Sequence, residues 1–300
     1  MKLRQISHSI SRSEAAAFRL YILPWMIGFL VFTVGPMVYS LYLALTNTIL
    51  GGSGHFIGLH NFIFMFTKDP LFYTSLVNTA YYAALSVPLG LLIAFVLALL
   101  LNMKMPGMAL FRTVFYIPSV VNGVAVILLW GWIFNPSYGL LNYLLSIIGM
   151  KGPDWLANPA SAMPAIIFMS LWTIGGPMVI FLASLQGIPA ELFESADIDG
   201  AGWWTKTMRI TIPSVSPVIF FNLILGLIGG LQVFNQAYIL TNGGPLNATT
   251  TYVLNLFNYG FVYLKVGYGS ALAWVLFIII LGLTLFIMRT SRRWVYYGET

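Results

Sequence analysis

Four of the eight acidic side chains lie within nine positions, as Glu191, Glu194, Asp197 and Asp199. Carboxylates in pairs can act as general acids and bases, and with histidine they can hold a metal ion. The three histidines, however, fall in terminal or external segments, and the sequence has no cysteine. No nucleophile elbow or metal-ligand spacing accompanies the acids. We therefore expect a surface that contacts a partner, with no catalytic residue and no metal site.

A second group of chemically useful residues is neutral and lies in a long apolar segment. At about 100° per residue, a helix places these residues within a sector of roughly 80°: Asn222, Gly226, Gly229, Val233 and Gln236, with Gln232 at its edge. One interpretation is close helix packing through glycine, with amide hydrogen bonds between helices. The other is the lining of a water-filled cavity suited to an uncharged, polyhydroxylated solute.

Two further candidates for such a lining stand beside residues that break helices. Asn122 follows Pro118, and Trp172 precedes the run Gly175-Gly-Pro177. Proline and glycine free backbone groups from helical hydrogen bonds. Inside a membrane, freed groups are tolerated only against protein or a wet cavity.

The apolar segments lack the groups that drive transport directly. Proton-coupled transporters usually keep Asp, Glu or His inside a span, and no predicted span here contains one. The chain has no Gly-Lys dipeptide, so the phosphate loop G-x-x-x-x-G-K-[ST] is absent. If this chain moves a solute, the energy is expected to come from another polypeptide.

Composition places these groups in a membrane. Of 300 residues, 59% are hydrophobic and 7% are charged, whereas soluble chains carry about a quarter charged residues. A spanning helix needs about 20 apolar residues, and six stretches qualify: Tyr21 to Thr46, Leu76 to Leu101, Thr113 to Phe134, Met163 to Gln186, Val215 to Leu240 and Ser270 to Met288. Such continuous runs exclude the alternating strands of a β-barrel. We predict an all-α integral membrane protein with a six-span helical bundle.

The basic residues predict how this bundle is oriented. Eleven of the fourteen Lys and Arg lie on one side of the spans, which makes both termini cytoplasmic. Residues 1–20 then form a basic cytoplasmic segment, and residues 21–300 form the membrane domain. The first apolar run is too long for a signal peptide and lacks a cleavage pattern. The net charge of +6 reflects this topology, or contact with anionic lipid, and indicates no nucleic-acid partner.

The acidic cluster falls in a predicted cytoplasmic loop, residues 187–213. Pro189 and Gly200 mark the start and end of a short helix. A second short helix, Ala201 to Arg209, precedes Pro213. The two would form a compact knob, whose tandem tryptophans call for a cover of partner protein or lipid headgroups.

The run from Glu194 to Pro213 resembles the EAA loop of permeases from ATP-binding-cassette importers, read as E-A-A-x-x-D-G-A and then I-T-L-P. In that family the loop forms a coupling helix that seats in a separate ATPase subunit. The resemblance implies that the following residues form the docking core and the end of the motif: Glu194, Ser195, Ala196, Asp199, Gly200, Ala201 and Pro213. Ser195 replaces the usual alanine, and Thr207 stands where phenylalanine is common.

Other segments are similar to carbohydrate importers, notably Asp69-Pro-Leu-Phe72, Gly139-Leu-Leu-Asn142 and Asn242-Gly-Gly-Pro245. The last is typical of the first of two paired permeases, of the maltose or glycerol-phosphate type. The resemblance implies a type I importer permease in the cytoplasmic (inner) membrane of a bacterium or archaeon. It implies four partners: a second homologous permease, an ATPase dimer that binds ATP and Mg, an extracytoplasmic solute-binding protein and a carbohydrate. The chain itself would bind no cofactor.

The sequence leaves the solute and two rival functions open. Neutral amides and aromatic rings suit a sugar or oligosaccharide, and a glycerol phosphate ester is the second choice. A secondary transporter or channel would need an ion-sensitive group in a span. An intramembrane enzyme would need His, Asp or Glu on facing spans, and the predicted spans have none.

Overall fold

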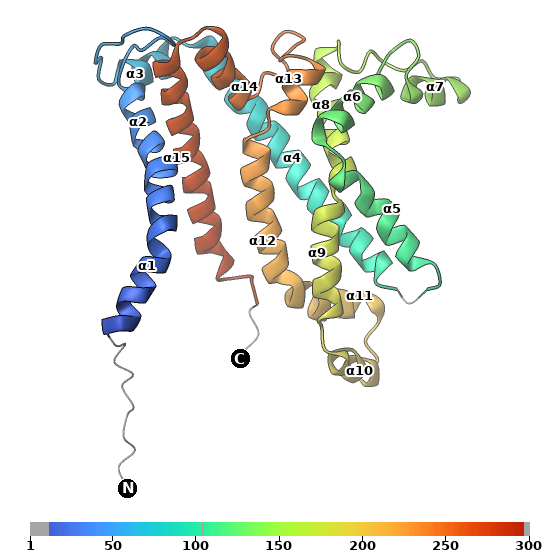
Figure 1. Cartoon of the computed structure of the whole chain (residues 1–300). Coiled ribbons are helices and arrows are strands. Elements are labelled where there is room, and N and C mark those ends of the chain that lie inside the picture. The colour runs from blue at the N-terminus through green and yellow to red at the C-terminus, as the bar shows by residue number, and fades with distance from the viewer. Residues whose placement is uncertain (1–11, 104, 297–300) are drawn as a thin grey trace.

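The computed structural model describes residues 12–103 and 105–296, and this part of the chain consists of helices joined by turns and loops, with one isolated bridge between Thr46 and Phe56. Long helices lie side by side, and short helices gather at both of their ends (Figure 1). The helices are α1 (Arg12–Phe29), α2 (Gly35–Ala44), α3 (His60–Thr67), α4 (Pro70–Leu101), α5 (Met108–Val120), α6 (Gly123–Ile133), α7 (Leu140–Ile147), α8 (Pro159–Ser170), α9 (Gly175–Gln186), α10 (Ala190–Ile198), α11 (Trp203–Lys206), α12 (Ile212–Leu231), α13 (Asn235–Leu240), α14 (Tyr252–Phe257) and α15 (Val266–Ser291).

Four stretches of the described chain are helical, long and apolar enough to cross a membrane: Phe18–Ala44, Pro70–Leu101, Trp203–Leu240 and Val266–Ser291. Two bent pairs, α5 with α6 and α8 with α9, bring the number to six if each pair counts as one span. The prediction of an all-helical membrane protein is confirmed, with four to six spans.

The third predicted span is broken close to the proline at which the sequence predicted a break or a kink. Its two helices, α5 and α6, meet at 99°. The break is at Val121, whose backbone is extended, and not at Pro118, which lies inside α5. Asn122 caps α6, because its side-chain Oδ1 accepts a hydrogen bond from the Val124 N–H at 2.9 Å.

The fourth predicted span breaks where its glycines and proline indicated. A 3-10 turn, Leu171–Thr173, ends α8, and α9 starts at Gly175 with a bend of 44° between the two parts. A Cβ added at Gly175 would stand 2.7 Å from the Phe115 carbonyl oxygen and 3.0 Å from Ser119 Oγ. Glycine is therefore required here for the close packing of α9 on α5.

Helix α4 is the centre of the packing. It lies against α9 and α12, while α15 packs on α2. Its N-terminus is fixed by the buried carboxylate of Asp69, which accepts hydrogen bonds from the Leu71 N–H at 2.9 Å and the Tyr268 hydroxyl at 2.6 Å. Burial, followed by the negative charge of Asp69, raises the pKa of Tyr259 to about 12. The carboxylate thus joins α4 to the start of α15.

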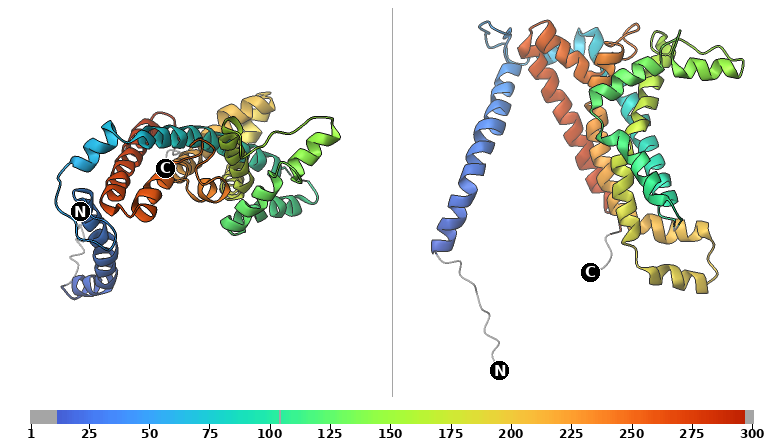
Figure 2. Two further views of the ribbon diagram at one scale, coloured as in Figure 1. Left: turned by 90° about the horizontal axis from the view of Figure 1, so that it is seen from above. Right: turned by 45° about the vertical axis from the view of Figure 1, so that its right-hand side comes forward.

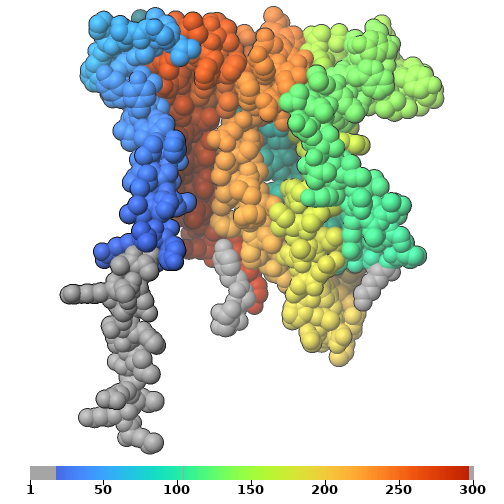
Figure 3. Space-filling model, in the orientation of Figure 1, coloured from blue at the N-terminus to red at the C-terminus, as the bar shows by residue number. Residues whose placement is uncertain are grey.

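Helix α1 stands apart from the other long helices (Figure 2). Nearly all its described side chains from Phe18 onward are exposed, among them Tyr21, Trp25 and Phe29. The N-terminal end of α1 and the C-terminal end of α15 lie at the same end of the molecule as α10 and α11 (Figure 1). In Figure 3 the segment that contains α10 and α11, drawn in yellow, projects below the long helices.

Candidate functional site

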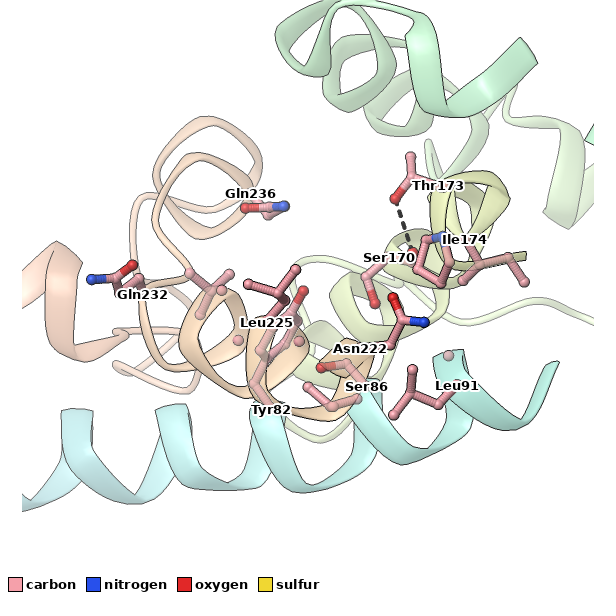
Figure 4. A pocket seen from close by; sticks show the side chains of 18 of the residues that line it. Tyr82, Ser86, Leu91, Ser170, Thr173, Ile174, Asn222, Leu225, Gln232 and Gln236 are labelled. Carbon is pink, nitrogen blue, oxygen red and sulfur yellow. Dashed lines mark hydrogen bonds between the residues drawn. The ribbon is translucent and has the colours of Figure 1, made fainter. Parts of the chain in front are cut away.

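A cavity of about 640 Å³ opens between α4, α9, α12 and α13. The side chains around it come from both halves of the sequence (Figure 4). It is lined by Tyr82, Ser86, Val87, Gly90, Leu91, Ser170, Thr173, Ile174, Gly176, Pro177, Ile180, Asn222, Leu225, Gly226, Gly229, Gly230, Gln232, Val233, Phe234, Asn235 and Gln236. None of these described lining residues is charged. The wall therefore offers neutral hydrogen-bonding groups separated by apolar surface.

Asn222 is the polar group of this wall with the clearest capacity to bind a ligand. Its side chain is buried, and its Nδ2 has no hydrogen-bond partner in the described part of the chain. Ser170 and Thr173, by contrast, already donate to backbone carbonyls, at 2.6 Å to Ile167 and 3.1 Å to Ser170. A buried N–H without a partner is costly, so a solute hydroxyl or a water molecule that accepts from Asn222 would be stabilised.

The structure brings three of the five predicted path residues into this cavity, namely Asn222, Gln232 and Gln236. Asn122 and Trp172 are not among its lining residues. Asn122 is used as the cap of α6. Trp172 packs its ring edge-on to Trp130, with 5.9 Å between ring centroids. Both residues are exposed in the described chain and lie outside this cavity, so their role in the path stays a prediction.

The small and polar stripe of α12 supports both interpretations of the sequence, helix packing and cavity lining. A Cβ on Gly226 would lie 2.9 Å from Val87 Cγ1, and one on Gly230 would lie 3.3 Å from Ala83 Cβ, so these glycines pack α12 on α4. Gly229 has nothing within 4 Å of its Cβ position and lines the cavity. Both helix packing and cavity lining therefore contribute to the pattern.

A row of aromatic rings leads out from the cavity. Phe234 lines the cavity and stacks on Tyr238, with centroids 5.2 Å apart and planes 15° apart. Phe257 contacts both rings and stacks on Phe261, which is exposed. Such a row presents flat apolar faces beside the amides of the wall.

Sequence reasoning missed the side of the cavity that faces α12. Tyr82 and Ser86 come from α4, and Ser170 comes from α8. The four-residue spacing of Tyr82 and Ser86, which places them on one helix face, is the only signal the sequence offers for them. Which face of α4 turns toward α12 depends on the contacts of Gly226 and Gly230, and these contacts appear only in the folded chain.

The acidic loop forms the short helix that Pro189 and Gly200 predicted. Helix α10 begins directly after Pro189, and Gly200 follows it with φ +73°. The Ala201 N–H donates to the Ala196 carbonyl at 2.8 Å, and the Gly200 N–H donates to that of Asp197 at 3.0 Å. These two bonds are the Schellman pattern that ends a helix on a left-handed glycine.

Most of the predicted docking residues are exposed on this helix and the turn after it. Glu194, Ser195, Asp199 and Gly200 are exposed, and Ala196 and Ala201 are half-buried. Ile198 on the same helix is 88% exposed. This surface combines acidic and apolar groups, and its contacts with a partner remain a prediction.

The second helix of the loop differs from the prediction. It begins at Trp203 instead of Ala201, and it does not end at Arg209. A π-helical turn, Thr207–Thr211, joins α11 directly to α12, with the Ile212 N–H donating to the Thr207 carbonyl. Pro213 is the second residue of α12 and follows the π-helical turn closely, where the regular α-helical hydrogen-bond pattern is already interrupted. The loop and the cavity wall are consequently parts of one continuous helical element.

The two departures from the family motif have local hydrogen bonds. The Ser195 hydroxyl donates to the Leu192 carbonyl at 3.2 Å, within α10. Thr207 is buried, and its hydroxyl donates to the Trp203 carbonyl at 2.9 Å. An ion pair between Lys206 and Asp197 ties α11 to α10 and is the only ion pair among the side chains that the structure describes, residues 18–103 and 105–296.

Comparison with known proteins places this arrangement in a family. Residues 86–291 match the family described as binding-protein-dependent transport system inner membrane component. The probable ABC transporter permease protein YesP of Bacillus subtilis is 42% identical over 97% of this chain and 95% of its own length. The trehalose/maltose transport system permease protein MalF of Thermococcus litoralis is 33% identical over 96% of this chain and 97% of its own.

Solved structures agree with these relatives. A chain of a bacterial ABC transporter involved in import of the acidic polysaccharide alginate superposes with a TM-score of 0.84 at 26% identity, over 96% of this chain and 98% of that one. A second structure holds the alginate transporter in complex with a periplasmic protein bound to an alginate pentasaccharide, again with a TM-score of 0.84 at 26% identity, over 94% and 96% of the two chains. The chain therefore belongs to the inner membrane components of binding-protein-dependent transport systems, the permeases of ATP-binding-cassette importers.

Proposed function

We propose that this chain is one of two paired permeases in an ATP-driven importer of sugars or oligosaccharides. Its partners are a second homologous permease, a dimer of ATPase subunits that binds ATP and Mg, and an extracytoplasmic binding protein that delivers the solute. The chain binds no cofactor and catalyses no reaction. It lies in the cytoplasmic membrane of a bacterium or archaeon, with both termini and the loop 187–213 on the cytoplasmic side.

The observation that carries this proposal is the continuity between the exposed loop and the cavity wall. Helix α11, the π-helical turn and α12 run without interruption from Trp203 to Leu231. Asn222, Gly226 and Gly229 of this element line the cavity, and α10 is tied to its start by the Asp197–Lys206 pair. A displacement of α10 can therefore reach the cavity wall through this ion pair and one continuous helical element.

A neutral carbohydrate fits the cavity better than a phosphate ester does. Sugar rings offer hydroxyls to amides and apolar faces to aromatic rings, and the wall supplies Asn222, Gln232, Gln236 and Phe234. A fixed negative charge buried in this cavity would need a compensating charge, and the described lining has no cationic side chain. The name of the trehalose/maltose relative supports a neutral carbohydrate.

Closure of the ATPase dimer would supply the motion. With Glu194, Ser195, Ala196, Asp199, Gly200 and Ala201 seated in the ATPase, α10 moves with that subunit. Pro213 and the π-helical turn before it lie where the loop passes into α12. The displacement rocks α12 relative to the second permease and turns the cavity from one side of the membrane to the other. The coupling residues transmit displacement and perform no covalent chemistry.

A charge reversal in the loop tests this assignment. The importer is purified as the assembled complex from membranes, and ATP hydrolysis stimulated by binding protein and sugar is measured for Glu194→Lys. We expect at least a tenfold loss of stimulated hydrolysis, because an acidic contact with the ATPase becomes repulsive. Asp154→Lys makes the same charge change on an exposed residue in the segment between α7 and α8, elements that lie at the opposite end of the molecule (Figure 1), and it should leave the activity unchanged.

Unaltered stimulation in Glu194→Lys would remove this loop from the coupling path. Uptake that survives loss of ATP and follows a proton gradient would instead assign the chain to secondary transport. Import of a glycerol phosphate ester but of no sugar would overturn the proposed solute alone.

A further inference from the structure

A second cavity, distinct from the neutral one, lies at the end of the molecule that carries α10. It measures about 570 Å³ and lies between α12 and the last two turns of α15. Six residues line it: Phe220, Leu285, Met288, Arg289, Ser291 and Arg292. The proposed translocation role uses none of these residues. We call this cavity the α12–α15 groove.

The groove is amphipathic along its length. Phe220, Leu285 and Met288 form apolar wall, and Leu285 and Met288 are about half exposed. Arg289 and Arg292 stand at the end of α15, and both are exposed. No acidic side chain is among the described lining residues, and neither arginine forms an ion pair within the described chain. The groove therefore offers two positive charges next to a hydrocarbon-like surface.

The chain after α15 holds this groove in place. Trp294 packs edge-on to Phe220, with ring centroids 6.1 Å apart. The Tyr296 N–H donates to Ser216 Oγ at 2.8 Å, and the Ser291 carbonyl accepts from the N–H groups of Trp294 and Val295. The segment that follows Arg292 is thus fastened across α12, and the mouth of the groove is a built feature of the fold.

We infer that the α12–α15 groove binds one anionic phospholipid, with its phosphate at Arg289 and Arg292 and an acyl chain along Leu285 and Met288. Basic pockets between helices at the cytoplasmic face of a membrane suit anionic headgroups, and guanidinium groups pair with phosphate in a bidentate geometry. The choice of the inner leaflet rests on the orientation proposed above. Two positive charges without an acid favour an anionic lipid over a zwitterionic one.

The test measures lipid binding by native mass spectrometry, independently of transport. The delipidated importer complex is titrated with dioleoyl phosphatidylglycerol or with dioleoyl phosphatidylcholine. We expect one tight phosphatidylglycerol site that phosphatidylcholine fills poorly. The double variant Arg289→Gln/Arg292→Gln should weaken this site by about 30-fold, since each arginine near an anionic lipid surface contributes about a factor of five.

Two further variants separate the groove from general charge effects. Arg19→Gln/Arg209→Gln removes two exposed arginines from the same end of the molecule but outside the groove, and it should keep the site. Leu285→Trp keeps both charges and fills the groove, and it should also lose the site. Because Leu285 is exposed, this variant is expected to fold even if the arginine double variant does not.

Three results would overturn the inference. The first is equal affinity for phosphatidylglycerol and phosphatidylcholine. The second is an equal loss of binding in Arg289→Gln/Arg292→Gln and in the control Arg19→Gln/Arg209→Gln. The third is a site that the isolated chain shows but the assembled complex lacks. The last result would assign the groove to contact with the second permease. A failure of the coupling proposal leaves this measurement unaffected, because lipid binding requires no ATP hydrolysis.

Discussion

At the residue scale, two buried asparagines can be compared, one that lines the neutral cavity and one that lies outside it. Asn222 lines the neutral cavity and keeps an unpartnered Nδ2. Asn255 on α14 is also buried, and neither of its polar side-chain atoms has a partner in the described chain, but it lies outside the cavity lining. An unsatisfied buried amide lowers stability by about 1–3 kcal/mol. A bound solute can offset this cost only where it forms a hydrogen bond with the buried amide.

Replacing these asparagines with leucine should therefore have different effects on transport. Asn222→Leu is expected to raise the sugar concentration for half-maximal uptake about tenfold, since a lost hydrogen bond to solute is worth roughly 1–1.5 kcal/mol. Asn255→Leu should leave uptake unchanged. Neither variant should lower the thermal unfolding temperature, because each removes unsatisfied polar atoms. Equal effects of the two substitutions on uptake would contradict a binding role for Asn222.

At the scale of elements, the sequence predicted which segments are helical better than how they join. The long apolar runs located the long helices, and the pair Pro189 and Gly200 located α10. Both signals work because hydropathy and helix capping depend on residues that are close in the sequence. A break or kink was predicted near Pro118, but its 99° angle and its place at Val121 were not, and neither was the unbroken passage from α11 to α12. Both depend on tertiary contacts and on a π-helical turn, which leave little trace in residue types.

The stripe on α12 shows the same limit. Its residues were predicted from helical periodicity, but which of the lining glycines also packs on α4 depends on the neighbour that each glycine meets. Gly226 meets Val87, whereas Gly229 meets open space. The sequence alone gives both positions the same residue type.

These two glycines form a matched pair for testing the packing of α12 on α4. Gly226→Ala places a methyl group 2.9 Å from Val87 Cγ1 and is expected to lower the free energy of unfolding by about 1–3 kcal/mol through overpacking. Gly229→Ala meets nothing within 4 Å and should be neutral or stabilise the helix by up to about 1 kcal/mol. Thermal unfolding in detergent measures both. A greater loss of stability in Gly229→Ala would show that the stripe packs in the opposite sense.

At the scale of the whole molecule, the chain combines the wall of a neutral cavity with an exposed helical loop that is continuous with this wall. Helices α4, α9 and α12 enclose the neutral cavity, and the same helical element that carries Asn222 extends to the exposed α10–α11 loop (Figure 1). Helix α1 stands apart with exposed apolar side chains, as expected of a helix that contacts lipid or a second permease. Under the proposed function the chain works only with its partner subunits, and its movement is expected to originate in one of them.

The most direct test of this view is a cross-link from the loop to the ATPase. The native chain has no cysteine, so Ser195→Cys on exposed α10 can carry a single photoactivatable probe in the assembled importer. We expect an adduct with the nucleotide-hydrolysing subunit, and none from Ser146→Cys on α7 at the opposite end. Free reaction of Ser195→Cys with a hydrophilic maleimide in the complete complex, without any such adduct, would contradict the proposed coupling.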